Sequence, residues 1–322
     1  MRTGAVGAGR GLAASVRYRS NGMDHEAGVR EGASVTGQIS VILTTYRRED
    51  ALQAVLRGLA RQSDRNFEII VADDGSGPAT ADVIARARVH CPVPLQHIWQ
   101  EDRGFRASEA RNRGIIASSG AYCIFLDGDC VPRPDFVATH RRLAEPGWFV
   151  TGNRILMSRE LTGRVLASHC EIELWSLKDW LAPRCRQQIN RLAPLLALRL
   201  GRLRKLRAFV WRGARSCNLA VWRSDLDRVD GFDATYRGWG LEDSDLMIRL
   251  MHAGVRRKDG NFATGVLHLW HPESDRSSLP ANLLLLDAAQ RSDRIRAVAG
   301  LSTLERADEI HTEPLGKVAE SG

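Results

Sequence analysis

A chain of 322 residues is long enough for one large α/β domain with appendages, or for two domains, and its 43% hydrophobic residues can build a substantial core. No apolar stretch reaches the roughly 20 residues that span a bilayer. The six cysteines form no CxxC pair, which argues against a disulfide framework and favours a cytoplasmic protein with reduced thiols. The net charge of +8 indicates an anionic partner: nucleic acid, an acidic membrane surface or a phosphorylated substrate.

Residues 1–37 are mainly Gly, Ala, Ser and Arg, and they lack the apolar segment of a secretory signal. We predict that this stretch is a disordered leader. The ordered chain is expected to begin with Gln38–Tyr46, QISVILTTY, which is apolar and β-branched as strands are.

The next segments alternate between strand and helix patterns. Strands are predicted over 38–46, 67–72 and 93–99, with helices over 50–62 and 79–90. This rhythm predicts a doubly wound parallel sheet, whose ligand crevice lies beyond the carboxyl ends of the strands. Thr45 ends the first strand, and Asp73 and Asp74 follow the second. We therefore expect these three side chains to face the crevice.

Ala121–Val131, AYCIFLDGDCV, is a hydrophobic run that ends in two aspartates separated by one glycine. A short run that is apolar on both sides predicts a strand buried on two faces. The carboxylates of Asp127 and Asp129 can hold a hard divalent cation and leave positions open for phosphate oxygens. A simple strand-to-turn boundary is the alternative, because Asp and Gly both favour turns. The polar residues at the ends of the neighbouring strands favour the functional interpretation.

A helix that opens at Ala107 or Ser108 is predicted just before this strand. Arg106 and Arg111 are candidates to bind a diphosphate, because a guanidinium group forms fork-like contacts with phosphate oxygens. The alternative is that both arginines lie on a solvated helix face.

The segment from Trp180 to Ser224 contains no Asp or Glu, and leucines alternate with its many arginines. This pattern predicts a basic amphipathic helix over 180–212, broken by Pro194 and Gly201. Such a helix can lie in an anionic membrane interface, burying its leucines while its arginines reach phosphates. An ordinary helix packed on the domain and a nucleic-acid patch are the alternatives.

A strand over 214–222 and a helical turn over 223–229 lead to the loop YRGWG, in which two glycines flank Trp239. Three acidic residues follow in the predicted first turn of a helix: Glu242, Asp243 and Asp245. The helix macrodipole accounts for one of them, since acidic groups stabilise helix N-termini. Three exceed what capping requires, which indicates a functional role.

A last strand is predicted over 261–268. It ends at His268, and a second histidine, His271, follows shortly after. Both are possible metal ligands. The remainder, 279–322, is interpreted as a polar, Arg-rich helical tail without a catalytic signature.

Taken in this order, the motifs resemble an inverting family 2 glycosyltransferase with the GT-A fold, a Rossmann-like α/β fold with a mostly parallel central sheet. The resemblance covers about Ile39 to Pro272 and is carried by four stretches: VILTTYRR, FEIIVADDGSG, RNRGIIASSGAYCIFLDGDCVP and CNLAVWRSDLDRVDGFDATYRGWGLEDSDLMIRLMHAG. The last is similar to the galactosyltransferase and chondroitin-polymerase groups. The resemblance implies a GT-A domain over 38–278, with a nucleotide-sugar half over 38–135 and an acceptor half with the helical insert over 136–278.

The resemblance also implies roles for the crevice residues. Thr45 and either Asp73 or Asp74 would contact the nucleoside, usually uridine, and Arg111 would lie near the nucleotide. Trp239 would line the sugar and acceptor pocket.

For the metal, the resemblance implies that Asp127 and Asp129 hold Mn²⁺ or Mg²⁺, with Asp129 as a direct ligand. A histidine after the last strand would complete the site, with His271 preferred slightly over His268.

The catalytic base would be one carboxylate of the Glu242-Asp243 pair, with Asp243 the first choice. The implied reaction moves a hexose-type sugar, expected to come from a UDP-sugar, to a hydroxyl of a glycan or lipid-linked saccharide in cell-surface polysaccharide synthesis. No nucleic-acid partner is expected, and our hypothesis is that the basic insert docks the enzyme at the inner face of a membrane.

Two alternative functions use the same features differently. A nucleotidyl- or phosphotransferase would use Asp127 and Asp129 for a metal-bound nucleotide, but it leaves GWGLED unexplained. A catalytically inactive binding protein would grip nucleic acid through the basic insert.

Overall fold

The computed structural model describes residues 35–304 and 311–312. These residues all belong to the second of two compact units, Gly32–Gly322. The predicted leader therefore lies outside the described residues up to residue 34. Within the stretch expected to be the leader, Val35 is buried in the main hydrophobic cluster, whereas residues 36 and 37 are exposed.

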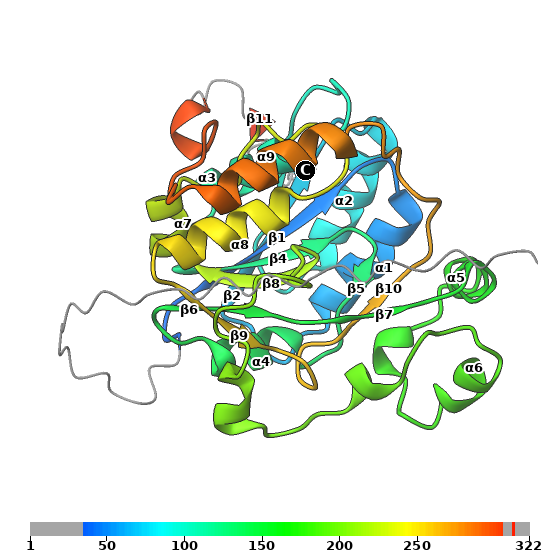
Figure 1. The fold of residues 1–322 in the computed structure, drawn as a ribbon. Helices are drawn as coiled ribbons and strands as arrows, with labels where there is room; N and C mark the ends of the chain where they lie inside the picture. The colour runs from blue at the N-terminus through cyan, green and yellow to red at the C-terminus, as the bar shows by residue number, and fades with distance from the viewer. Residues whose placement is uncertain (1–34, 305–310, 313–322) are drawn as a thin grey trace, which may run out of the picture. The chain divides into compact units, whose positions relative to one another are not determined.

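The main sheet has eight strands among the described residues, in the order β11-β3-β2-β1-β4-β8-β6-β9 (Figure 1). The bounds are β1 Ile39–Thr45, β2 Phe67–Asp73, β3 Leu95–Trp99, β4 Tyr122–Asp127, β6 Trp148–Thr151, β8 Asn218–Trp222, β9 Arg256–Asp259 and β11 His311–Thr312. Strands β3, β2, β1 and β4 are parallel, and β8 runs antiparallel to β4. The predicted α/β class with a mostly parallel central sheet is confirmed.

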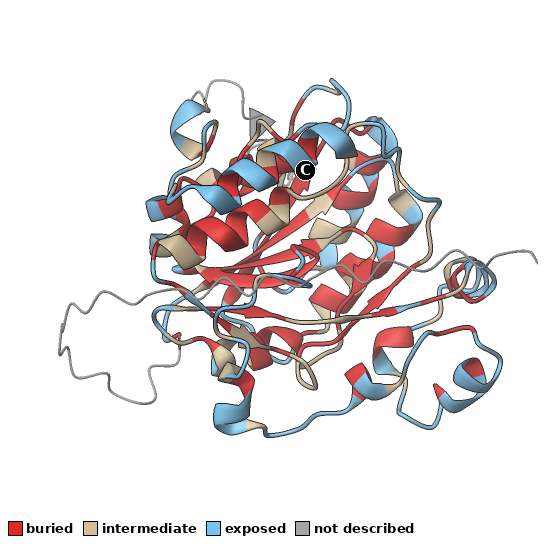
Figure 2. Ribbon diagram, viewed as in Figure 1, coloured by how far each residue is buried: buried red, intermediate tan, exposed pale blue. Residues whose placement is uncertain are grey.

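Helices cover both faces of this sheet because alternate residues of each strand point to opposite sides. Val41 and Leu43 of β1 belong to one hydrophobic cluster with α1, whereas Ile42 belongs to a second cluster with α3 and α8. The sheet and the inner helix faces are accordingly buried (Figure 2). The helix bounds are α1 Glu49–Ala60, α2 Pro78–His90, α3 Ala107–Ala117, α4 Phe136–Leu143, α5 Arg159–Ala167, α7 Arg223–Val229, α8 Glu242–His252 and α9 Leu279–Arg291.

The predicted strands over 214–222 and 261–268 are shorter than expected. Strand β8 begins only at Asn218, and β10, Val266–His268, begins only at Val266. Residues before β10 turn instead of extending, because Phe262 has a left-handed φ of 56°. The elements α4, α5, β6, β7 (Arg154–Leu156) and β9 were not predicted.

The predicted amphipathic helix over 180–212 is wrong. This segment forms three short pieces: α6 Leu181–Cys185, η2 Ala193–Leu195 and η3 Gly201–Lys205. Pro183 and Pro194 remove backbone donors, and Gly201 has a positive φ of 48°, so no long helix forms. Arg204 is buried and donates to the carbonyl oxygens of Asp259 (2.9 Å) and Asn261 (2.7 Å). Within the described residues no helix is both long and apolar enough to cross a bilayer.

A small second sheet, β5-β10-β7, brings distant segments together beside the main one. Strand β5 is Cys130–Val131, directly after the two aspartates of the DGD motif. His268 of β10 pairs with Cys130. This pairing carries the end of the last strand to the carboxyl end of β4.

The C-terminal segment braces the loop before α8. Helix α9 packs on α8 (Figure 1). Its buried Asn282 donates from Nδ2 to the carbonyl oxygens of Arg237 (3.0 Å) and Gly240 (2.9 Å). The glycine-flanked tryptophan loop is thus fixed from the side of the tail.

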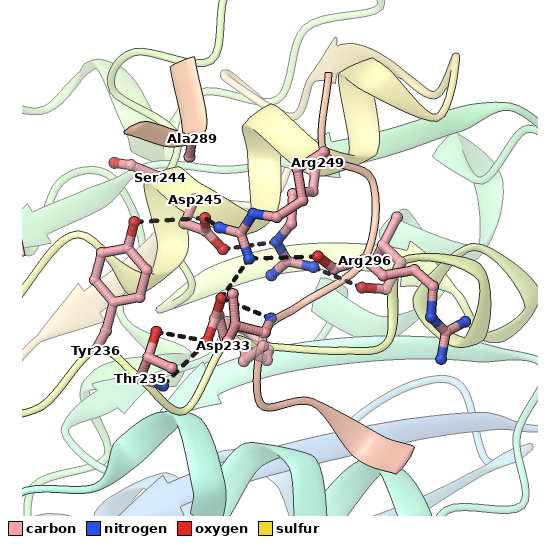
Figure 3. Close-up of polar contacts among 12 residues, drawn as sticks. Asp233, Thr235, Tyr236, Ser244, Asp245, Arg249, Ala289 and Arg296 are labelled. Carbon is pink, nitrogen blue, oxygen red and sulfur yellow. Dashed lines mark hydrogen bonds and ion pairs between the residues drawn. The ribbon is translucent and has the colours of Figure 1, made fainter. Parts of the chain in front are cut away.

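Beyond α9, Arg294 joins two buried carboxylates. These are Asp233 and Asp245, which Figure 3 labels within one polar cluster. Arg294 donates to Asp233 Oδ2 (2.6 Å) and to Asp245 Oδ1 (2.8 Å). Asp245 also accepts from Arg249 Nε at 2.7 Å, and its side chain is fully buried. The third acidic residue of GWGLEDSD is therefore part of a structural ion-pair network.

We expect Arg294→Met to lower the free energy of unfolding by about 3–5 kcal/mol, because it leaves two buried carboxylates without this partner. Arg291→Met is the matched control, since its ion pair with Asp287 is exposed and such pairs contribute little. Urea unfolding followed by circular dichroism measures both. Equal midpoints for the two variants would contradict the structural role of Arg294.

Candidate active site

The two aspartates of the DGD motif lie where β4 meets β1. Asp127 is the last residue of β4, and the Gly128 N–H donates to the Thr44 carbonyl oxygen at 2.7 Å. A Cβ at Gly128 would lie 2.9 Å from that oxygen, so only glycine fits this close approach. The glycine between the carboxylates therefore sets the turn that presents them at the carboxyl end of the sheet.

Asp129 lies against both predicted histidines. His271 Nε2 is 3.3 Å from Asp129 Oδ2, and His268 Nε2 is 3.7 Å from Asp129 Oδ1. The centroids of the two imidazole rings are 5.2 Å apart. The structure thus brings together one carboxylate and two imidazoles, a donor set that suits a divalent cation of the Mn²⁺ kind.

The histidine geometry supports this fit. His271 Nδ1 lies 2.6 Å from the Pro272 carbonyl oxygen, which can only accept, so Nδ1 donates there and Nε2 is the ring nitrogen that faces Asp129. Burial lowers the pKa of His268, although the charge of Asp129 opposes this shift. Each histidine therefore directs one ring nitrogen at the carboxylate, as metal ligands do.

Arg111, in α3, is the centre of the crevice. Its guanidinium donates to Asp127 Oδ1 at 3.2 Å and to Glu242 Oε1 at 3.0 Å, and it lies 5.3 Å from the Phe232 ring centroid. Burial lowers the pKa of Arg111, but the charges of Asp127 and Glu242 more than offset this, and the net direction is upward. The alternative of a solvated helix face is wrong for this residue.

The Glu242-Asp243 pair opens α8 under unusual backbone geometry. Leu241 precedes it with a left-handed φ of 79°, which is costly for a branched side chain. Burial raises the pKa of both carboxyls, and the charge of Asp243 raises that of Glu242 further, whereas Arg111 lowers both. Glu242 is engaged by Arg111, while the half-buried Asp243 accepts from the Ser244 N–H at 2.7 Å.

The carboxylates predicted to contact the nucleoside are engaged within the protein. Asp73 accepts from the Ser76 N–H (2.9 Å) and pairs with His97 Nε2 (3.0 Å). Asp74 accepts from Gln100 Nε2 (2.6 Å) and from the Arg106 N–H (2.7 Å). Burial raises the pKa of Asp74 to about 6. Both carboxylates shape the loops at this edge of the sheet.

Thr45 is different, because its buried hydroxyl has no hydrogen-bond partner among the described residues. Buried polar groups usually have partners, so this hydroxyl retains an unused hydrogen-bonding capacity next to the turn at Gly128. The Arg106 side chain, by contrast, is buried and donates to Glu109 Oε2 (2.9 Å) and to the Glu101 carbonyl oxygen. It braces the loop, and the alternative of a solvated helix face is wrong for Arg106 as well.

Trp239 lines a cavity of about 390 Å³ beside this loop. Phe105, Arg106, Arg237 and Ser278 are among its other lining residues. Arg276 lies over the Trp239 ring, 5.0 Å from the centroid. The cavity has aromatic and cationic walls, which suit a sugar that carries polar or anionic groups.

Three residues that border the DGD motif were not predicted as site residues. Cys130 and Cys217 are buried beside it, and Arg154 Nη1 lies 4.0 Å from Cys217 Sγ. The two cysteines belong to the stretches DGDCV and CNLAVW, but their spacing in the chain matches no metal-binding pattern. Only the pairing of β5 and β10 and the approach of β8 bring them to this place.

Family models match almost the whole of this region. The model described as glycosyl transferase family 2 matches residues 40–204, and the one described as N-terminal domain of galactosyltransferase matches residues 207–271. The chain belongs to glycosyl transferase family 2. The resemblance read from the motifs is therefore confirmed, and the chain carries a glycosyltransferase domain.

Curated relatives share this domain within longer proteins. Validoxylamine A glucosyltransferase from Streptomyces hygroscopicus subsp. limoneus is 29% identical over 232 residues, covering 67% of this chain and 48% of the relative. Chondroitin synthase from Escherichia coli is 24% identical over 237 residues, covering 67% of this chain and 32% of the relative. This chain therefore spans about half or less of the length of these relatives.

Solved structures share the fold at low sequence identity. The mannosyltransferase PcManGT from Pyrobaculum calidifontis, in complex with GDP-Man and Mn²⁺, has a TM-score of 0.50 at 17% identity, covering 74% of this chain and 59% of that one. Staphylococcus aureus TarS has a TM-score of 0.52 at 14% identity, covering 78% of this chain and 39% of that one. The expected GT-A fold is confirmed.

Proposed function

We propose that this chain is a metal-dependent, inverting glycosyltransferase that moves a hexose-type sugar from a nucleoside diphosphate sugar to a hydroxyl of a glycan or lipid-linked saccharide, in cell-surface polysaccharide synthesis. One observation carries the proposal: Arg111 joins Asp127, at the end of β4, to Glu242, at the start of α8. We therefore assign the end of β4 to the donor diphosphate and the start of α8 to the acceptor, within one crevice. This arrangement suits a reaction that must stabilise a leaving diphosphate and activate an acceptor within one site.

On the donor side, Thr45 would bind the nucleoside through its unpartnered hydroxyl, beside the loops shaped by Asp73 and Asp74. UDP is the first nucleotide to test. GDP is the second, because PcManGT was solved with GDP-Man and TarS 1-349 with UDP. Trp239 would contribute an aromatic wall for the sugar or the acceptor.

Asp129, His271 and His268 would hold Mn²⁺ or Mg²⁺, with Asp127 next to them. When bound, the ion neutralises negative charge on the leaving diphosphate. Arg111 fixes Asp127 in place through their ion pair. The His271 proton on Nδ1 is held by the Pro272 carbonyl oxygen, so Nε2 stays directed at Asp129.

Asp243 is the proposed base, which takes the proton from the acceptor hydroxyl as that oxygen attacks the anomeric carbon. Glu242 is held by Arg111, and we assign it to positioning the first turn of α8. The raised pKa of Asp243 makes its carboxylate a better proton acceptor than an ordinary aspartate. Attack from the face opposite the diphosphate inverts the anomeric configuration in one step.

The acceptor side includes an exposed apolar and basic surface. Leu203, Leu206 and Phe209 are 59%, 79% and 73% exposed, and Arg199 and Arg207 are exposed among them. Apolar side chains between arginines suit an anionic membrane interface even without a continuous helix. We propose that this surface docks the enzyme where a lipid-linked acceptor presents its sugar.

The donor site is tested by thermal unfolding with UDP and GDP, each with and without Mn²⁺. A nucleotide at 100 times its dissociation constant stabilises the native state by about 2.7 kcal/mol. We expect a metal-dependent rise in Tm for one nucleotide in the wild type. Asp129→Ala should lose the metal-dependent part of this rise in Tm, whereas Asp82→Ala, which removes an exposed carboxylate on α2, should keep it. A wild-type Tm that no nucleotide changes would contradict the proposed donor site.

The base is tested by Asp243→Asn. This variant should lower kcat by about 10²–10⁴-fold, the usual contribution of general base catalysis. Nucleotide-dependent thermal stabilisation should remain, because the proposed base acts on the acceptor. Asp227→Asn is the control, since its side chain is 52% exposed and pairs with Arg223 on α7. Near-normal kcat in Asp243→Asn would rule out this assignment.

The membrane surface is tested by vesicle flotation. Wild type should float with phosphatidylglycerol vesicles and less with phosphatidylcholine vesicles. Leu206→Ser/Phe209→Ser should weaken binding by about tenfold or more, because each apolar side chain gains roughly 1.5–3 kcal/mol on full burial. Leu283→Ser/Leu284→Ser is the matched control, because these leucines are exposed on α9 instead. Equal flotation of all three proteins would refute the proposed docking surface.

A further inference from the structure

Two buried thiols border the DGD motif on its inner side. Cys130 is the first residue of β5, and Cys217 directly precedes β8. One carboxylate oxygen of Asp127 and the two sulfurs all lie within 4.8 Å of one another. The cysteine spacing predicts only reduced thiols, and the proposed transfer reaction does not use them.

A second donor set shares one of these thiols. Cys130 Sγ, a carboxylate oxygen of Asp129 and a ring nitrogen of His268 also lie within 4.8 Å of one another. Cys130 Sγ is 3.5 Å from Asp129 Oδ1. Donor atoms around a tetrahedral zinc ion lie about 3.3–3.8 Å apart, given bonds of roughly 2.0–2.3 Å. Small side-chain movements would therefore bring the three donor atoms of either set to bonding distance from one ion.

The donor chemistry differs between the two sides of the motif. The outer side, with Asp129 and His271, offers oxygen and nitrogen to a hard or borderline cation. The inner side, with Cys130 and Cys217, offers sulfur, which selects zinc-class ions over Mn²⁺ and Mg²⁺. We propose that a zinc-class divalent cation binds on the inner side through Cys130, Cys217 and Asp127.

Charge balance is compatible with this site. Each coordinating thiol gives up its proton to solvent, because the thiolate is the metal ligand. The two thiolates and the Asp127 carboxylate then balance the divalent ion and the guanidinium of Arg154, whose Nη1 is 4.0 Å from Cys217 Sγ. Arg111 remains paired with Glu242 on its other side.

A functional consequence follows, and this part rests on the proposed function. Asp127 belongs to the inner set and also borders the cation expected to accompany the donor. A zinc-class ion bound through Asp127 and the thiols would displace that cation or distort its site. The enzyme would then be inhibited by zinc at concentrations at which manganese supports transfer.

The binding claim is tested with Co²⁺, a spectroscopic substitute for Zn²⁺, on the reduced full chain without any donor. Wild type should develop thiolate-to-cobalt charge-transfer absorption in the near ultraviolet and release protons. Cys130→Ser and Cys217→Ser should lose this absorption and bind Zn²⁺ about 100-fold more weakly or worse in competition with a chelator, since even outer-shell changes cost roughly 10–100-fold. Cys91→Ser, a half-buried cysteine at the end of α2, should behave as wild type.

Wild-type protein that binds Co²⁺ without the charge-transfer absorption, or not at all, would overturn the inference, and this outcome does not depend on how the variants fold. Unchanged absorption in either serine variant would overturn it as well, because the proposed site uses both thiols. His271→Ala should keep the absorption, which separates the inner set from the outer one. The cobalt experiment contains no donor, so its result is independent of the nucleotide experiments. Thiolate absorption in a protein that responds to no nucleotide would support the zinc site and refute the proposed function. A nucleotide response in a protein without thiolate absorption would support the proposed function and refute the zinc site.

Discussion

The buried guanidinium of Arg111 is the interaction on which the rest of the crevice depends. It contacts Asp127 and Glu242, which come from opposite halves of the chain, and a buried carboxylate without a partner is costly. Because Arg111 pairs with both, β4 and α8 can end at the same point with their acidic residues close together. The same contact engages Glu242 and Asp127, and it leaves Asp243 for the proposed role of base and Asp129 for the proposed role of metal ligand.

A second layer of ion pairs holds this arrangement from behind. Asp245 lies one turn into α8, bound by Arg249 and by Arg294 from the segment after α9. Arg294 also binds Asp233, before the tryptophan loop, so the C-terminal segment fixes both ends of the loop that precedes the proposed base. Residues that lack any catalytic signature thereby support the position of Asp243, and the left-handed Leu241 is tolerated because the structure on both sides is fixed.

The sequence predicted what depends on local pattern. Strands β1, β2 and β4 were found because their apolar runs are continuous, as in strands buried on two faces, and the aspartates after them marked the crevice. The amphipathic helix expected over 180–212 does not form. Breaks at Pro194 and Gly201 were expected, but the segments between them are also not helical, and only pieces of three to five residues remain. The pairing of Arg111 with Glu242, and the meeting of Cys130 with Cys217, depend on contacts between residues far apart in the chain, which no local pattern encodes.

The most direct test of the central claim is to incubate the purified chain with a panel of UDP-, GDP- and TDP-sugars and Mn²⁺, and to identify the nucleotide product. The account predicts that one sugar nucleotide is consumed with release of its nucleoside diphosphate, and that omission of the metal stops the release. Release of pyrophosphate would instead indicate a nucleotidyltransferase using the same carboxylates. Consumption of no donor by the folded protein, with and without candidate acceptors, would contradict the claim that this crevice transfers sugars.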